Sequence, residues 1–282
     1  MQPTQQICKN CGNVFEGKFC NNCGEKVYSA HDKTIKHLLE EVFHFMTHVD
    51  GKFFKSLKLL FSKPGFIATE FCRGVRKKYY PPISLFLIGV VIYLLFPLVQ
   101  GLNMSLSMNV NTFNSIGITL VEKVAVKKAA KKKISMDELE HKYNAKSPAF
   151  AKVLLLTLLP LTALVLWLLF SNKKEYFFDH FILSTEMNTF FVYITFLLLP
   201  FTLSTLSTIA HWLGINFRYG DLIMIPIQLA ALMFAFPSSL KRFYNISLGE
   251  AIGKSLLFLL LYSILVYVVY RLLLVFVVLL FL

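Results

Sequence analysis

Hydrophobic positions along this chain form long runs after residue 82 and short, regularly spaced groups before it. The long runs suit membrane helices, because about twenty apolar residues of helix cross a hydrocarbon core of about 30 Å. We expect about five transmembrane helices, at residues 83–99, 149–170, 189–213, 222–236 and 252–282. The fourth run is marginal in length. The pattern therefore predicts an all-α polytopic membrane helical bundle over residues 83–282.

The shorter groups before the bundle indicate helices at a membrane surface. Between residues 29 and 62 apolar residues recur at helical spacing, and in 52–61 lysines alternate with phenylalanines and leucines. Basic and aromatic residues on one amphipathic helix favour binding to anionic lipid headgroups. We expect interfacial helices and a basic juxtamembrane segment over 29–82, and we call residues 63–82 the joint. Tyr79 and Tyr80 are expected to belong to an aromatic belt at the membrane interface, and Pro81 and Pro82 separate the joint from the first span.

A polar and basic stretch at 101–148 separates the first two spans. It contains Ser135 followed by Glu138, which is a capping-box pattern for a helix start. Ser147-Pro148 is expected to end that helix before the second span. Five lysines between residues 127 and 133 are expected to be solvated.

Composition and charge exclude a soluble domain and favour lipid over nucleic acid. The chain has 56% hydrophobic and 16% charged residues, with a net charge of +13. The basic residues flank the apolar runs, so anionic headgroups and membrane orientation explain them without nucleic acid. Four of them, Arg73, Arg76, Lys77 and Lys78, directly precede the first span and predict a cytoplasmic N-terminus. No apolar signal segment precedes them.

The N-terminal residues 1–28 carry four cysteines in two C-x-x-C-G units. Cys8 and Cys11 form the first pair, and Cys20 and Cys23 form the second. Each pair presents two thiolates to one ion, which predicts a small zinc ribbon with a structural Zn²⁺. Two disulfides are the alternative, but they need an oxidising compartment. Cys72 lies apart and is expected to be a packed thiol.

The local geometry of the ribbon follows from the residues around its cysteines. Gly12 and Gly24 are expected to supply the positive φ that the turn after each second cysteine needs. Val14-Phe15 and Lys18-Phe19 flank Glu16-Gly17 and suggest a hairpin. Further along, His37, His44 and His48 share a helix edge, where either a second metal or a free polar edge is conceivable.

The cysteine pairs, Pro64-Gly65 and the pattern Gly74-x-Arg76-x-x-Tyr79-x-x-Pro82 before an apolar helix resemble a family known as the bacterial domain of unknown function 3667. Tyr176-Phe-Phe-Asp-His180 and Lys241-Arg-Phe-Tyr244 look similar to later landmarks of that family. Val75 departs from it, because family members often carry lysine there. The resemblance implies a membrane protein with an N-terminal zinc ribbon and supplies no activity.

Few polar residues interrupt the spans, and each is a candidate functional position. Asp179, His180 and Glu186 are expected at the inner mouth of the third span. Arg271 is expected near the outer surface, where it pairs with Asp221 or reaches lipid phosphates. The eleven apolar residues after Arg271 tilt, pack on the bundle or re-enter the membrane.

These features favour a non-enzymatic membrane protein. Its ribbon would bind a protein partner or act as a sensor, and its bundle would anchor it or handle lipid. A channel or transporter is the first alternative, supported by prolines at 160, 200 and 226. A lipid-modifying enzyme using Asp179, His180 and Glu186 is the second. No residue is assigned a catalytic role, and a homo-oligomer stays open.

Overall fold

A computed structural model describes residues 5–27, 51–96, 98, 102–173, 176–215 and 220–282. The expected interfacial helix before residue 51 and its three histidines lie outside the described residues. The elements in chain order are β1 (Gln6–Ile7), β2 (Val14–Phe15), α2 (Gly51–Ser62), α3 (Phe66–Arg73), α4 (Pro82–Leu95), α5 (Leu106–Ser115), α6 (Leu120–Lys132), α7 (Met136–Leu154), η2 (Leu155–Thr157), α8 (Leu158–Phe170), α9 (Phe177–Val192), η3 (Tyr193–Leu198), α10 (Leu199–Trp212), α11 (Asp221–Tyr244), α12 (Leu248–Ile264), η4 (Leu265–Tyr270) and α13 (Arg271–Leu280).

Long apolar helices dominate the described chain and confirm the all-α bundle. Four are long and apolar enough to cross a membrane, namely Met136–Phe170, Phe177–Trp212, Leu222–Tyr244 and Leu248–Leu280. The first expected span is shorter, because α4 has 14 residues and extends about 21 Å. The protein is therefore a membrane protein, with a small cysteine module at its N-terminal end.

The second expected span begins earlier than its apolar run, and the helix stop at Pro148 was wrong. Ser135 caps α7 as predicted, since its side chain accepts a hydrogen bond from the backbone N–H of Glu138 at 3.1 Å. The helix then continues through Pro148 into η2 and α8. A proline removes only one backbone donor. Packing of α7 along α13 holds the helix together across that position.

Helix α9 is the centre of the bundle. Every residue from Phe178 to Val192 is buried, and the helix packs against α8, α4, α3 and α11. It begins at residue 177 rather than 189, because Phe178, Phe181 and Ile182 extend its apolar surface toward the ribbon. Asp179, His180 and Glu186 consequently lie on a buried helix and not at an open mouth.

The apolar tail after Arg271 has a partner of its own. Helix α13 packs against α5, α6 and α7, which are the helices of the stretch at 102–154. Leu274, Val275 and Val278 are buried there, as are Phe113 and Tyr143 from the partner helices. The tail thus forms the end of the last candidate span and completes a small helical core with α5, α6 and α7, and the lysines of α6 lie on the exposed side of that core.

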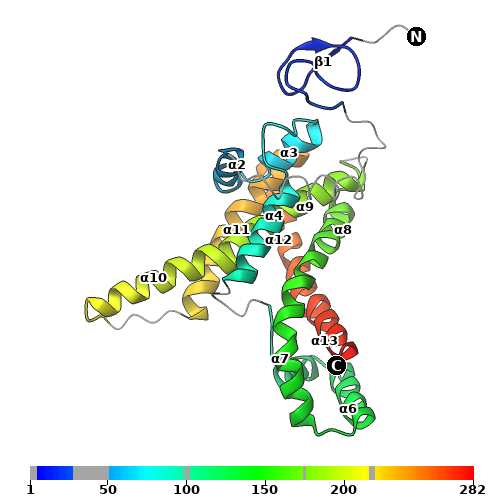
Figure 1. Ribbon diagram of the computed structural model, residues 1–282, viewed down its shortest axis with the longest axis vertical. Coiled ribbons are helices and arrows are strands. Elements are labelled where there is room, and N and C mark those ends of the chain that lie inside the picture. The colour runs from blue at the N-terminus through cyan, green and yellow to red at the C-terminus, as the bar shows by residue number, and fades with distance from the viewer. Residues whose placement is uncertain (1–4, 28–50, 97, 99–101, 174–175, 216–219) are drawn as a thin grey trace.

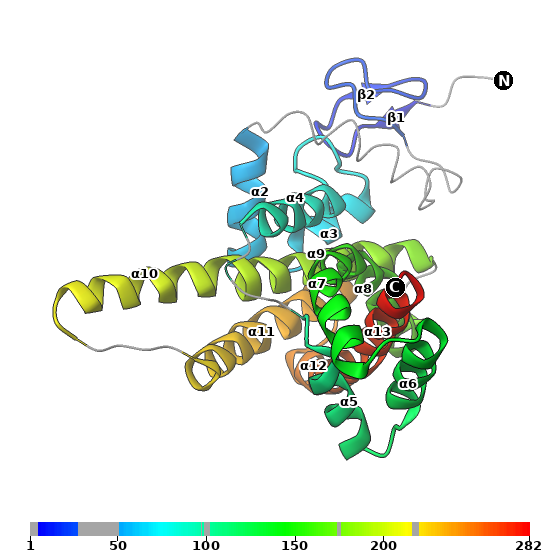
Figure 2. The same ribbon diagram turned by 60° about the horizontal axis from the view of Figure 1, so that its bottom comes forward.

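The cysteine module and helix α13 lie toward opposite ends of the molecule (Figure 1). The cysteine module, α2 and α3 form one end, and α5, α6, α7 and α13 form the other. We call these the ribbon end and the α13 end. Helix α10 extends away from the bundle between them (Figures 1 and 2), and its exposed residues include Phe201, Leu206 and Ile209, an apolar surface suited to lipid.

Candidate metal centre and its connection to the bundle

The two cysteine pairs sit in turns of the same geometry. The N–H of Gly12 donates to the carbonyl of Cys8 at 2.8 Å, and the N–H of Gly24 donates to the carbonyl of Cys20 at 2.7 Å. Both glycines adopt positive φ, 75° and 67°, as predicted. Each turn places both thiols of its pair on the same side, where the other pair meets them.

The strand pairing of the ribbon differs from the expected hairpin. Val14-Phe15 pairs antiparallel with Gln6-Ile7, and Phe19 forms an isolated bridge with Lys26. Each pairing therefore brackets one cysteine pair, whereas the expected hairpin joined the two. The turn at each cysteine pair reverses the direction of the chain. The segments on either side of that turn therefore pair with each other.

The four thiols fit a metal ion. All four Sγ atoms lie within 4.8 Å of one another, and two cross pairs, Cys8 with Cys23 and Cys11 with Cys20, are 3.6 Å apart. Tetrahedral coordination with metal–sulfur bonds of about 2.3 Å places sulfur atoms about 3.8 Å apart. None of the five cysteines forms a disulfide bond. The cluster can therefore hold one metal ion, with Cys8, Cys11, Cys20 and Cys23 as ligands.

The thiols do not share one electrostatic environment. Burial alone would raise the pKa of Cys20, but the backbone N–H groups of Cys23 and Asn22 and the neighbouring thiols lower it to about 6. The side chain of Asn10 and the backbone N–H of Glu25 lower the pKa of Cys23 as well. Burial raises the pKa of Cys8 to about 11. The second pair thus favours the thiolate form that a metal needs.

The ribbon docks on the joint through Glu25. This residue is buried, and one carboxyl oxygen accepts a hydrogen bond from the backbone N–H of Lys77 at 3.1 Å. Burial raises the pKa of Glu25, while the backbone N–H groups and the positive charges of Lys77 and Arg76 oppose that shift. A cavity of about 180 Å³ between the two parts is lined by Cys8, Glu25, Cys72 and Arg76 among others.

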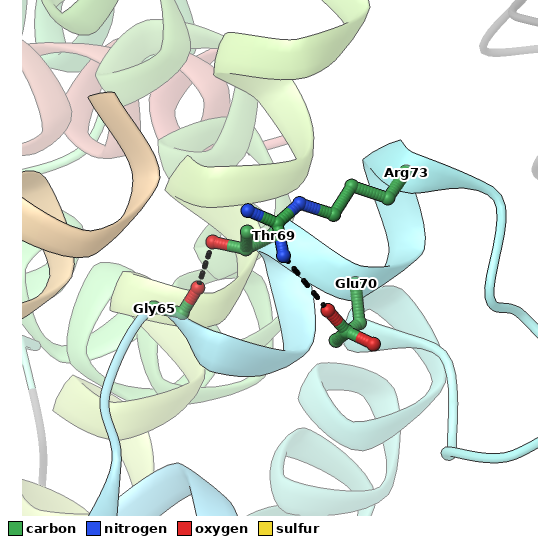
Figure 3. A network of polar contacts seen from close by, with 4 residues as sticks. All are labelled: Gly65, Thr69, Glu70 and Arg73. Carbon is green, nitrogen blue, oxygen red and sulfur yellow. Dashed lines mark hydrogen bonds and ion pairs between the residues drawn. The ribbon is translucent and has the colours of Figure 1, made fainter. Parts of the chain in front are cut away.

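Helix α3 lies within the joint, and Glu186 of the bundle caps its N-terminus. The N-terminal N–H groups of a helix lack partners within the helix. The carboxyl group of Glu186, on α9, accepts hydrogen bonds from the N–H of Gly65 at 2.9 Å and of Ala68 at 2.6 Å. In Figure 3 the Thr69 hydroxyl donates to the carbonyl of Gly65, and Arg73 pairs with Glu70 at the other end of the helix. Glu186 is therefore a structural cap.

The start of α3 also presses on α11. Gly65 adopts φ 79°, and a Cβ there would lie 2.6 Å from the Cα of Ser239. Arg242, near the end of α11, donates a hydrogen bond to the carbonyl of Pro64. Pro64-Gly65 thus marks a close backbone approach between two helices that are far apart in sequence.

The basic and aromatic residues of the joint divide into exposed and buried members. Lys77 and Lys78 are exposed, and their orienting role stays a prediction. Arg76 is buried with its guanidinium 4.4 Å from the ring centroid of Phe71. Tyr79 and Tyr80 are buried as well, so the expectation that they belong to an aromatic belt was wrong. Ring contacts with Phe66 and Phe53 hold them inside the protein.

The expected acid–base group is split between two places. Asp179 lines a polar pocket of about 880 Å³ together with Arg73, Lys173 and Arg242. The Nδ1 atom of His180 lies 2.7 Å from the Tyr244 hydroxyl, and that tyrosine also lines the pocket. Of the three expected residues only Asp179 is among the residues lining it.

At the opposite side of the bundle, Arg271 begins α13 and lines a pocket. Its guanidinium lies 4.9 Å from the ring centroid of Tyr267. The side chain of Asp221, its expected partner, lies outside what the structure describes. The pairing of these two residues therefore stays a prediction.

Two residues that connect distant parts of the chain, Glu25 and Tyr244, could not be recognised from local sequence patterns. Glu25 follows Gly24 directly, and its contact with Lys77 joins positions 52 residues apart. Tyr244 belongs to a landmark of the resemblance, but its approach to His180 spans 64 residues. Neither contact follows from local spacing. The sequence signal that could have identified Glu25 is an acidic residue directly after the glycine of a C-x-x-C-G unit.

Comparison with known proteins decides the family for part of the chain. Residues 50–94 match the family described as Protein of unknown function (DUF3667). This stretch holds α2, α3, the joint and nearly all of α4, so it confirms the resemblance at the joint. No curated protein matches the chain, and no solved structure matches it. The ribbon precedes the matched stretch, so the case for it rests on cysteine geometry.

Proposed function

We propose that the ribbon is a cytoplasmic zinc-dependent sensing module, and that its folded state is transmitted to a bacterial inner-membrane bundle through the joint. The observation that carries this proposal is the hydrogen bond from the Lys77 backbone to the buried side chain of Glu25. A ribbon that served only as a tethered adaptor would not need to bury a carboxyl group in the segment that enters the bundle. Four cysteine ligands leave no open coordination position for a catalytic water molecule, and this arrangement suits structural zinc.

A short and continuous path leads from the ribbon to the bundle. Glu25 contacts the backbone at Lys77, four residues beyond α3, and Glu186 of α9 holds the first turn of that helix. Helix α3 has 8 residues and is about 12 Å long, so both ends move as one body. Unfolding of the ribbon would release one end of α3 and thereby alter the contact of α3 with Glu186 on α9.

The experiment measures the joint with and without metal. The full chain is purified in lipid nanodiscs, zinc is quantified, and amide hydrogen exchange of residues 75–80 is followed before and after chelation. We expect one zinc per chain and faster exchange of the joint once the metal is removed, because ribbon folding and metal binding are one event. Equal exchange in both states would refute the proposal.

Two variants separate folding of the ribbon from its docking. Cys20→Ser should lose zinc and loosen the joint, whereas Cys72→Ser, outside the cysteine cluster, should keep zinc. Glu25→Gln should keep zinc and still loosen the joint, since the buried carboxyl is replaced. Tight protection of the joint in Glu25→Gln would show that the observed contact does not connect the parts.

Partner binding is the second candidate, and an exposed apolar surface on the ribbon favours it. Ile7 and Val14 are paired across the two strands and are 70% and 55% exposed, and Phe19 is 60% exposed. A protein partner that buries apolar side chains fits this surface. Cross-linking in cells with the wild type and with Ile7→Ser/Val14→Ser tests it. A cross-linked protein that persists in the double variant would contradict this role.

A further inference from the structure

A pocket between α11, α12 and the two π-helical segments has the features of a binding site. Its volume is about 680 Å³. Apolar residues line most of it, among them Leu229, Leu232 and Leu259, and Gln228, Ser263 and Arg271 add polar groups. The pocket lies within membrane-spanning helices, so hydrocarbon and lipid headgroups are the molecules with access to it.

Both π-helical segments that the structure describes contribute to this pocket. Thr195 and Phe196 come from η3, and Val266 and Tyr267 come from η4. A π-helical turn inserts a residue into an α-helix and is frequently found at functional sites. These two turns come from different spans and line the same pocket. A binding role would explain both distortions, which helix packing alone does not.

Two polar atoms at the pocket lack partners within the described part of the chain. The Nε atom of Arg271 and the hydroxyl oxygen of Thr195 are buried from solvent, and neither has a hydrogen bond. A charged group in a membrane helix is costly unless it meets a counter-charge. None of the described residues lining the pocket is acidic. The arrangement calls for an anion from outside the chain.

The dimensions fit a lipid chain. From Leu259 to Arg271 the helix rises about 18 Å, at about 1.5 Å per residue. One leaflet of the hydrocarbon core is about 15 Å thick, half of about 30 Å. The pocket is thus polar at the α13 end, with Arg271, and apolar along roughly one leaflet toward Leu259.

We propose that this pocket binds a membrane amphiphile with an anionic headgroup at Arg271 and an acyl chain along Leu229, Leu232 and Leu259. The phosphate of an acidic phospholipid and the carboxylate of a free fatty acid share this chemistry. Thr195 offers a hydroxyl donor to an ester or headgroup oxygen. The inference depends on the membrane placement and not on the sensing role of the ribbon.

Photoreactive lipids test the pocket in the full chain. Purified protein in nanodiscs is exposed separately to a photoreactive fatty acid, a photoreactive phosphatidylglycerol and a photoreactive phosphatidylcholine, and the labelled peptides are identified by mass spectrometry. We expect adducts on α11 and α12 with at least one of the two anionic probes and tenfold fewer with phosphatidylcholine. The two anionic probes distinguish a fatty acid from a phospholipid. Equal labelling by all three would overturn the proposal.

Variants establish that the label depends on the pocket. Arg271→Gln should lower labelling about tenfold, as expected for loss of one charge-assisted contact, whereas Arg271→Lys should retain most of it. Leu232→Phe narrows the apolar part and should lower labelling without touching the charge. Lys142→Gln, an exposed pair partner of Glu138, is the matched control and should change nothing.

Retention of the label in both Arg271→Gln and Leu232→Phe would reject the site. The double variant Asp221→Arg/Arg271→Asp provides a separate check on the charge. If this swap recovers the thermal stability lost in the single variants, an internal pair satisfies Arg271 and the lipid proposal is overturned. If neither single variant is rescued, Arg271 has its counter-charge outside the chain, as proposed.

Discussion

Glu186 and Arg271 are both ionisable groups in membrane helices, yet their surroundings are opposite. Both carboxyl oxygens of Glu186 accept backbone hydrogen bonds from α3, and the side chain is buried in protein. The Nε atom of Arg271 has no hydrogen bond within the described residues, and the side chain lines a pocket. A polar group whose hydrogen bonds are made within the protein stabilises the fold, whereas a polar group without such a partner can bind a ligand.

The largest effect is expected from Glu186→Gln. The amide keeps one acceptor but turns an N–H₂ group toward a backbone donor of α3, which should lower the free energy of unfolding by about 3 kcal/mol. Thermal unfolding in detergent measures it. Glu250→Gln, in the half-exposed pair with Lys254, is the control and should cost less than about 1 kcal/mol. Equal melting of the two variants would show that the cap on α3 contributes no more to stability than a half-exposed ion pair.

Gly65→Ala should have the next largest effect, roughly 2 kcal/mol. Its Cβ would meet the backbone of Ser239, so α3 must move from α11 and from the cap that Glu186 supplies. Gly117→Ala is the matched control, because Gly117 has a φ of 81° with open space around it. That variant carries the backbone strain alone, about 1 kcal/mol. Similar unfolding temperatures for the two variants would show that the α3–α11 contact is not rigid.

A pair of threonines gives the smallest and sharpest test. The Thr162 hydroxyl donates to the Leu158 carbonyl at 2.6 Å and accepts from the amide of Asn188 at 2.7 Å. Thr162→Val should therefore cost about 1 kcal/mol. Thr195→Val removes a hydroxyl without a partner and should leave stability unchanged in lipid-free detergent. A marked loss in Thr195→Val under those conditions would mean that the protein itself satisfies this hydroxyl.

Local patterns predicted those parts of the molecule whose chemistry is local. The two C-x-x-C-G units predicted both turns and the clustering of Cys8 and its three partners, because each turn is set by neighbouring residues and by the φ of Gly12 and Gly24. Long apolar runs predicted membrane helices for the same reason. The capping of α7 by Ser135 was likewise predictable from four consecutive residues.

Patterns failed wherever a distant element changed the outcome. Pro148 is a helix stop by local rules, but α13 packs along α7 and keeps the helix intact. Tyr79 and Tyr80 read as residues of a membrane interface, yet Phe66 and Phe53 enclose them. Asp179, His180 and Glu186 are close in sequence and were expected to act together, although α3 takes Glu186 as its cap and Tyr244 contacts His180.

The sequence by itself determined that this is a helical membrane protein with a four-cysteine metal module and a basic joint, since hydrophobicity and ligand spacing act over a few residues. Only the tertiary structure decided that Glu25 fastens the ribbon to the joint, that α13 completes the core of α5, α6 and α7, and that Arg271 lines a pocket built from two π-helical turns. These outcomes depend on which surfaces meet after the helices have formed. Contacts between residues far apart in the chain carry that information, and no local pattern contains it.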